Sequence, residues 1–120
     1  MPDAINLADK LSRFNETWTP YVVAALNGQL VKLAKLEGAF VWHDHADEDE
    51  LFLVLEGQLR IELRDGSVTL RPGELYVVPA GVAHRPVAEP TASVLLFEPA
   101  STAHTGTVET DRTVRQLDWI

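Results

Sequence analysis

The chain has 120 residues, a formal charge of −8 and no cysteine. A domain of this length buries about two-thirds of its unfolded surface, so it can fold without disulfides or a structural metal. The excess of acids argues against nucleic acid and anionic membrane surfaces as partners, because both need clustered Lys and Arg. Without a signal-peptide pattern or an apolar stretch of about 20 residues, we expect a cytoplasmic protein that has no membrane span.

A helix is predicted over residues 3–14. Asp3 is a candidate N-cap, and Leu7, Leu11 and Phe14 follow at helical spacing on one side. A helix of about 12 residues is marginal alone, so we expect this one to dock by its apolar stripe.

Short β-prone runs separated by turn residues follow from residue 17 onward. Asn27-Gly28 and Asp65-Gly66 are strong hairpin signals. The predicted strands are 21–26, 29–33, 39–43, 51–55, 58–63, 68–70, 75–78, 82–87 and 93–97. Such regularly spaced short strands predict an all-β sandwich or barrel.

The run 51–55 is apolar on both faces and must be covered on both. One face is expected to line the barrel, and the other to meet the N-terminal helix or a second subunit. This pattern predicts a homodimer. The polar tail offers Val114, Leu117, Trp119 and Ile120 as docking points.

Two histidines and one acid lie close together in the chain. Because side chains alternate along a strand, His43 and His45 are expected on one face, with Phe40, Trp42 and Asp44 on the other. Glu50 is expected to face the two histidines from the next strand.

A third histidine, His84, is expected to come from the opposite wall of the barrel. Three imidazoles and one carboxylate suit a divalent Fe, Mn, Co, Ni, Cu or Zn ion. A metal ion with six coordination positions would keep two of them open for substrate.

Other interpretations of these residues are open. Histidines in an acidic loop can simply be surface residues, and we assign Asp44, Asp47, Glu48 and Asp49 to a solvated loop that helps to attract cations. The glycine and glutamate of a calcium loop are not at their spacings. His104 is interpreted as a surface residue.

The chain contains two motifs, His43-x-His45-x4-Glu50-x6-Gly57 and Gly73-x5-Pro79-x-Gly81-x2-His84. They resemble the two motifs of the cupin family. The chain is also similar to small cupins described as mannose-6-phosphate isomerase-like. It departs from the family pattern in the spacing after Gly38 and in having Ala88 where asparagine often closes the second motif.

The resemblance implies a double-stranded β-helix, or jelly-roll, barrel with a short N-terminal helix. It also implies metal ligation by His43, His45, Glu50 and His84. We expect residues 1–120 to form a single cupin domain, with the helix within 1–16, the barrel over 20–98 and a tail over 99–120.

The expected function is a metal-dependent enzyme acting on a small oxygenated substrate by Lewis-acid or oxygen chemistry, isomerase-like or dioxygenase-like. The sequence identifies no catalytic residue and no organic cofactor. Arg85 is expected to point away from the pocket, which weighs against a phosphosugar. The alternatives are a metal-dependent binding or sensing module without catalysis, and a metal-free carbohydrate-binding barrel.

Overall fold

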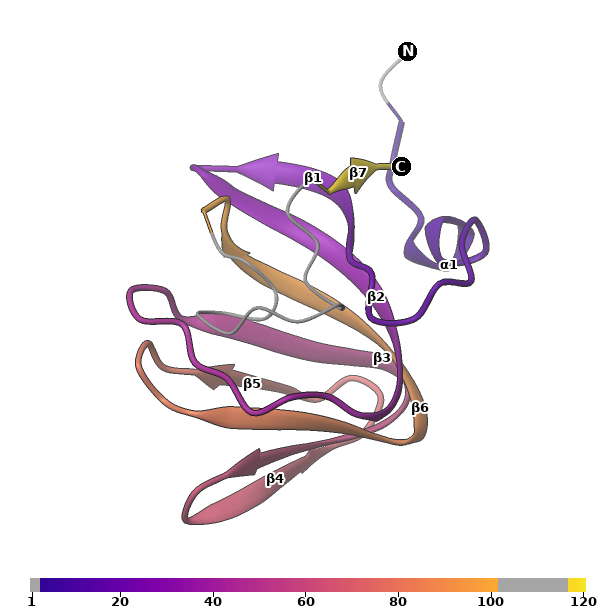
Figure 1. Cartoon of the computed structure of the whole chain (residues 1–120). Coiled ribbons are helices and arrows are strands. Elements are labelled where there is room, and N and C mark those ends of the chain that lie inside the picture. Colours follow the sequence, from indigo (N-terminus) through magenta and orange to yellow (C-terminus); the bar gives the residue numbers. More distant parts are fainter. Residues whose placement is uncertain (1–2, 102–116) are drawn as a thin grey trace.

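A single curled β-sheet makes up most of the structure. The computed structural model describes residues 3–101 and 117–120. Its elements are α1 (Leu7–Leu11), β1 (Tyr21–Leu26), β2 (Gln29–Ala39), β3 (Glu50–Leu63), β4 (Gly66–Leu70), β5 (Leu75–Val78), β6 (His84–Pro99) and β7 (Asp118–Trp119). The strands lie in the order β4-β3-β6-β2-β1-β7, with β5 paired to β3 (Figure 1). The predicted all-β jelly roll with one short helix is confirmed.

β3 and β6 are the long central strands, and each joins two strands that the sequence predicts as separate. They pair antiparallel from Leu51 opposite Phe97 to Leu63 opposite His84, and the register shifts on both sides of Gly57, with the extra residue in β3 before it and the extra residues in β6 after it. Gly57 has φ +80°, and a Cβ there would lie 2.1 Å from the carbonyl oxygen of Thr91. Gly57 therefore marks a close approach of two backbones and not a turn.

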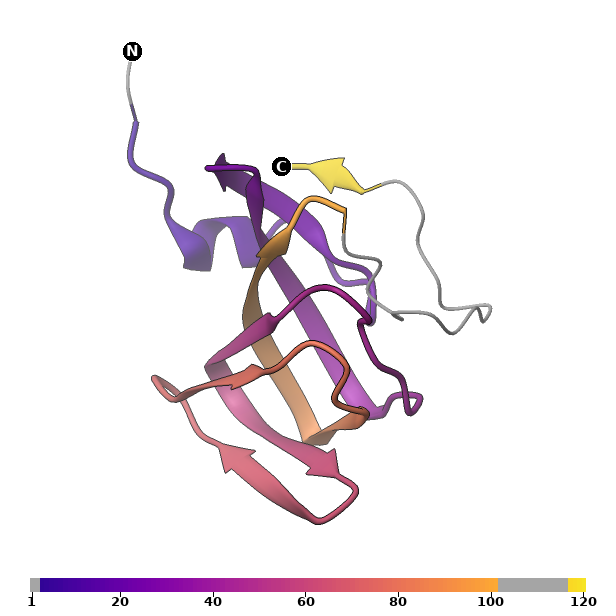
Figure 2. The same cartoon turned by 90° about the vertical axis from the view of Figure 1, so that its left-hand side faces the viewer.

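The N-terminal helix is shorter than the predicted 3–14. Its N-cap is Asn6 and not Asp3, because the Asn6 side chain accepts the backbone N–H of Asp9 at 3.0 Å. Leu11 and Phe14 nevertheless pack against β1 and β2, contacting Val23 and Leu33. α1 thus covers the outside of the sheet, as Figure 2 shows.

The end of the tail also docks on the sheet. β7 pairs parallel with β1, and Ile120 packs into the cluster under α1, where Lys10 Nζ donates to its carbonyl at 2.6 Å. The expected docking of Trp119 is wrong, since its side chain is 61% exposed. Val114 and His104 lie outside the described residues.

The core is split by the sheet into an inner and an outer cluster. Phe52 and Val54 of β3 face the inside, while Leu55 on the opposite face packs under α1. The prediction that both faces of residues 51–55 are covered is therefore confirmed only in part. On the neighbouring β5, Leu75 and Val77 are 55% and 43% exposed. No described helix is long and apolar enough to cross a membrane.

Candidate metal centre

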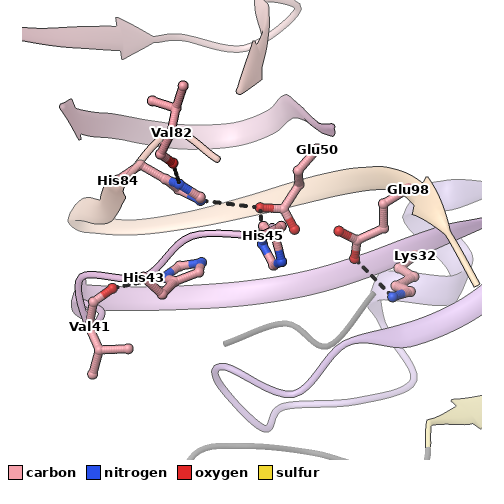
Figure 3. Close-up of polar contacts among 8 residues, drawn as sticks. All are labelled: Lys32, Val41, His43, His45, Glu50, Val82, His84 and Glu98. Atoms are coloured by element: carbon pink, nitrogen blue, oxygen red, sulfur yellow. Dashed lines mark hydrogen bonds and ion pairs between the residues drawn. The ribbon is translucent and has the colours of Figure 1, made fainter. Parts of the chain in front are cut away.

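The inner face of the barrel gathers four metal-ligating side chains. One donor atom from each of His43, His45, Glu50 and His84 lies within 4.8 Å of the other three, and all four side chains are buried. His45 Nε2 and His84 Nε2 are 3.3 Å and 3.4 Å from Glu50 Oε1. The structure therefore brings together all four residues that the sequence singles out (Figure 3).

His43 and His84 are held together by their backbones. Each donates its N–H to the carbonyl of the other, at 3.0 Å and 2.9 Å. The expected placement of His84 on a wall opposite His43 is wrong, because the two are bridged neighbours. The expected strand over 39–43 is wrong as well: β2 ends at Ala39, and His43 has only this isolated bridge.

The turn before His84 is tied to the segment that carries His45. The carbonyl of His45 accepts the N–H of Gly81 at 2.7 Å, and Asp49 Oδ1 accepts the N–H of Ala80 at 2.8 Å. The assignment of Asp49 to a merely solvated loop is therefore incomplete, because this carboxylate fixes a turn. Both contacts set the distance between the two halves of the site.

The tautomers of two histidines follow from their partners. Nδ1 of His43 contacts the carbonyl of Val41 at 2.9 Å, and Nδ1 of His84 contacts that of Val82 at 2.9 Å. A carbonyl only accepts, so both Nδ1 atoms carry the proton and both Nε2 lone pairs face the cluster. Burial is the main cause that lowers the pKa of His43 to about 4, and the charge of the neighbouring His84 is the second. The imidazole of His43 is therefore neutral at pH 7.

The donor set fits a cation. Among the described residues, none of the three Nε2 atoms nor Glu50 Oε1 has a hydrogen-bond partner. Buried polar atoms without hydrogen-bond partners are costly, and a divalent ion would satisfy all four at once. The three imidazoles and one carboxylate match the ligand preferences of a first-row transition metal.

A buried ion pair lies next to the cluster, and the sequence analysis missed it. Lys32 Nζ donates to Glu98 Oε1 at 2.8 Å, and both side chains are fully buried (Figure 3). The alternation of side chains along the strands indicates this pair. Lys32 shares the inward face of β2 with Ala34 and Leu36, and Glu98 shares that of β6 with Leu96. A charged residue on the buried face of a strand needs a buried partner.

The pKa values of the two buried carboxyls, Glu50 and Glu98, are shifted in opposite directions. Burial and the nearby charge of Glu50 raise the pKa of Glu98 well above its usual range. Burial also raises the pKa of Glu50, but its interactions with Glu98, His45 and His84 outweigh burial and hold it well below that range. The two directions favour the charged form of Glu50 over that of Glu98.

Phe40 and Trp42 do not share a face as the alternation predicts. Phe40 is buried in the inner core, because the register shifts between Glu37 and Ala39. Trp42 lies outside and stacks on Arg64, whose Cζ is 4.0 Å from the ring centre. Arg85 points away from the site as expected and binds Glu62 at 2.6 Å.

Comparison with known proteins identifies the family. Residues 29–98 match the cupin domain. A cupin-2 domain protein from Shewanella frigidimarina is 50% identical, with a TM-score of 0.78 over 79% of this chain and 93% of that chain. Protein NMB1881 from Neisseria meningitidis is 36% identical, with a TM-score of 0.73 over 82% of this chain and 100% of that chain.

A larger enzyme is also similar. Hydroquinone 1,2-dioxygenase from Sphingomonas, solved with 4-hydroxybenzoate bound, is 27% identical, with a TM-score of 0.70 over 82% of this chain and 32% of that chain. The family match covers more than half of the sequence, so the chain belongs to the cupin family. Its His-His-Glu-His cluster fits a metal-binding cupin.

Proposed function

We propose that this cupin is a metal-dependent enzyme whose ion is held by His43, His45, Glu50 and His84. The observation that carries the proposal is the convergence of three Nε2 atoms and one carboxylate oxygen within 4.8 Å in a buried site, where none of these atoms has a hydrogen-bond partner among the described residues. A bound ion supplies Lewis acidity or, if it is iron, redox chemistry with oxygen. Iron, manganese, nickel, zinc, cobalt and copper all suit this ligand set.

The chain's own residues prepare the site. The carbonyls of Val41 and Val82 hold the imidazoles of His43 and His84 with Nε2 inward. The lowered pKa of Glu50 favours its charged form, so Glu50 offers a charged oxygen. All four side chains are buried, and a site of low dielectric strengthens the interaction between an ion and its ligands.

Metal binding is tested by titrating the metal-free protein with zinc or cobalt in a calorimeter. The expected result is one site per chain, with affinity reduced at least about a hundredfold in Glu50→Gln. Asp47→Asn is the matched control, because Asp47 is an exposed acid in the same loop. Equal affinity in Glu50→Gln and the wild type would exclude this ligand set.

Oxygen chemistry is the first reaction class to test, and the similarity to a hydroquinone dioxygenase supports that choice. Oxygen consumption by the iron-loaded protein would be followed with phenols and diketones as substrates. Consumption that is lost in Glu50→Gln supports the enzyme. If no panel member turns over while the metal binds, the alternative of a metal-dependent binding or sensing module is favoured.

The remaining assignments are a single domain over 1–120, a cytoplasmic location and a homodimer. The absence of cysteine is compatible with a reducing compartment. The exposed Leu75 and Val77 on β5 lie beside the half-buried Leu51 and Leu53, and this apolar surface suits a second copy. Sedimentation of wild type and Val77→Lys tests the dimer, which the variant is expected to dissociate.

A further inference from the structure

A small cavity lies directly beside the candidate metal centre. His43 and Glu50 are its only charged or ionisable lining residues among the described part of the chain, and the rest of its wall is apolar. Trp18, Phe40 and Phe52 provide the aromatic part of that wall. The cavity thus has a polar end at the metal cluster and an apolar body.

The aromatic wall is continuous from the cavity to the ligands. The rings of Trp18 and Phe40 stack with centres 4.4 Å apart, and Phe40 meets His43 edge-on at 5.6 Å. Stacked and edge-to-face contacts are the arrangements by which aromatic side chains also hold an aromatic ligand. A flat ring could therefore extend this series of contacts.

Within residues 3–101 and 117–120, no lysine or arginine lines the cavity. Lys32 is bound to Glu98, and Lys35 Nζ donates to the carbonyl of Phe14 at 2.7 Å. Arg85 and Arg64 lie outside, on Glu62 and Trp42. A phosphate or carboxylate buried in this cavity would have no counter-charge except the metal itself, so a charged substrate body is disfavoured.

The cavity is small in the present conformation. Its volume of about 30 Å³ accommodates about two water molecules, whereas a cavity that binds benzene measures about 150 Å³. A ring can enter only if part of the wall moves. Trp18 is the best candidate, because a rotation of its side chain leaves the hydrogen bond from its backbone N–H to the Lys35 carbonyl intact.

Trp18 is also held in an unusual conformation. Its φ is +58°, a left-handed value that costs a non-glycine residue about 1 kcal/mol or more. Its indole N–H donates to the carbonyl of Glu37 at 3.0 Å, which keeps the ring over the cavity. The chain therefore accepts backbone strain at the residue that closes the apolar end.

We propose that the substrate is a compact, uncharged phenol, an aromatic ring that carries one or two hydroxyl groups. This proposal rests on the metal-dependent function above. The oxygens of the phenol lie at the metal cluster, its ring lies against Trp18 and Phe40, and Trp18 sets the upper limit on its size. Sugar phosphates and aromatic acids are disfavoured, because their charge meets no cationic side chain among the described residues that line the cavity.

The test uses the full chain loaded with zinc, after its zinc content has been measured. Catechol is the uncharged probe, and protocatechuate has the same oxygen pair plus a carboxylate. Calorimetry is expected to show catechol binding at least about tenfold tighter than protocatechuate and than mannose 6-phosphate. Equal or tighter binding of either charged compound would overturn the proposal.

A second measurement locates the ligand. With Trp42 and Trp119 replaced by Phe, Trp18 is the only remaining tryptophan, and its emission is expected to change with the same Kd as the calorimetric curve. Calorimetric binding without a change in Trp18 emission would overturn the cavity assignment alone. A protein that retains no zinc would instead overturn the proposed function and, with it, this inference.

The size limit is tested with tert-butylcatechol. Trp18→Ala is expected to raise its affinity relative to catechol by about tenfold or more, while Trp42→Ala, a matched change outside the cavity, leaves the ratio as in the wild type. An unchanged ratio in folded Trp18→Ala would contradict a role for Trp18 in size selection.

Discussion

His43 and His84 are joined by a pair of backbone hydrogen bonds, of 3.0 Å and 2.9 Å, and their rings lie with centres 4.3 Å apart. Two candidate ligands from distant parts of the sequence are therefore fixed to each other before any ion is considered. Since each ring is also anchored through Nδ1, the site is preorganised and an ion need not assemble it.

The buried pair of Lys32 and Glu98 should matter for stability. Lys32→Met leaves the Glu98 carboxyl without its donor in the barrel interior, and we expect unfolding free energy to fall by about 3 kcal/mol. Replacing both residues with Met should restore much of this loss. Chemical denaturation of the metal-free proteins measures the coupling.

Arg13→Ala provides the control, because the Arg13–Asp9 pair is about half exposed and should contribute less than about 1 kcal/mol. If Lys32→Met were as mild as Arg13→Ala, the two buried side chains would not depend on each other as their 2.8 Å contact implies.

Gly57→Ala is expected to destabilise the fold severely, by more than about 2 kcal/mol. The new Cβ would meet the carbonyl oxygen of Thr91 at 2.1 Å, and the positive φ adds strain. Gly28 has a similar φ of +77° but nothing within 4 Å, so Gly28→Ala should cost only about 1 kcal/mol. Thermal unfolding compares the two, and equal losses would show that the contact with Thr91 relaxes freely.

The metal-free protein should lose stability in acid through His43. Its pKa falls from 6.5 to about 4 on folding, so between these values the unfolded chain binds more protons and stability rises with pH. The contribution is complete above pH 6.5 and is lost towards pH 4, with a total of about 3 kcal/mol.

The measurement is the difference in unfolding free energy between wild type and His43→Gln across this pH range. Subtraction removes the opposing contribution of Glu98, whose raised pKa favours the folded state at low pH. A difference that does not change with pH would mean that His43 titrates alike in the folded and unfolded chains.

The sequence predicts the barrel and the four clustered side chains because both depend on local patterns. Hairpin residues and alternating apolar positions mark the strands, and the ligand spacing marks the site. The burial of Phe40 could not be predicted this way, because a register shift after Glu37 breaks the alternation on which the prediction relied.

The interior neighbours of the site were missed for a different reason. Lys32, Glu98 and Trp18 gain their roles only from contacts between distant segments: Lys32 meets Glu98 across β2 and β6, and Trp18 stacks on Phe40. Charge and aromatic content alone do not distinguish such residues from those on the surface. The phase of Lys32 and Glu98 along their strands is the one local signal for them.

The most direct test of metal binding by His43, His45, Glu50 and His84 is elemental analysis of untagged protein purified without added chelator, compared with His84→Ala prepared in parallel. We expect about one divalent transition metal per chain in the wild type and a content near zero in folded His84→Ala. A wild-type protein without metal that also fails to take up manganese, iron, nickel or zinc, or a variant that retains the full content, would contradict this expectation.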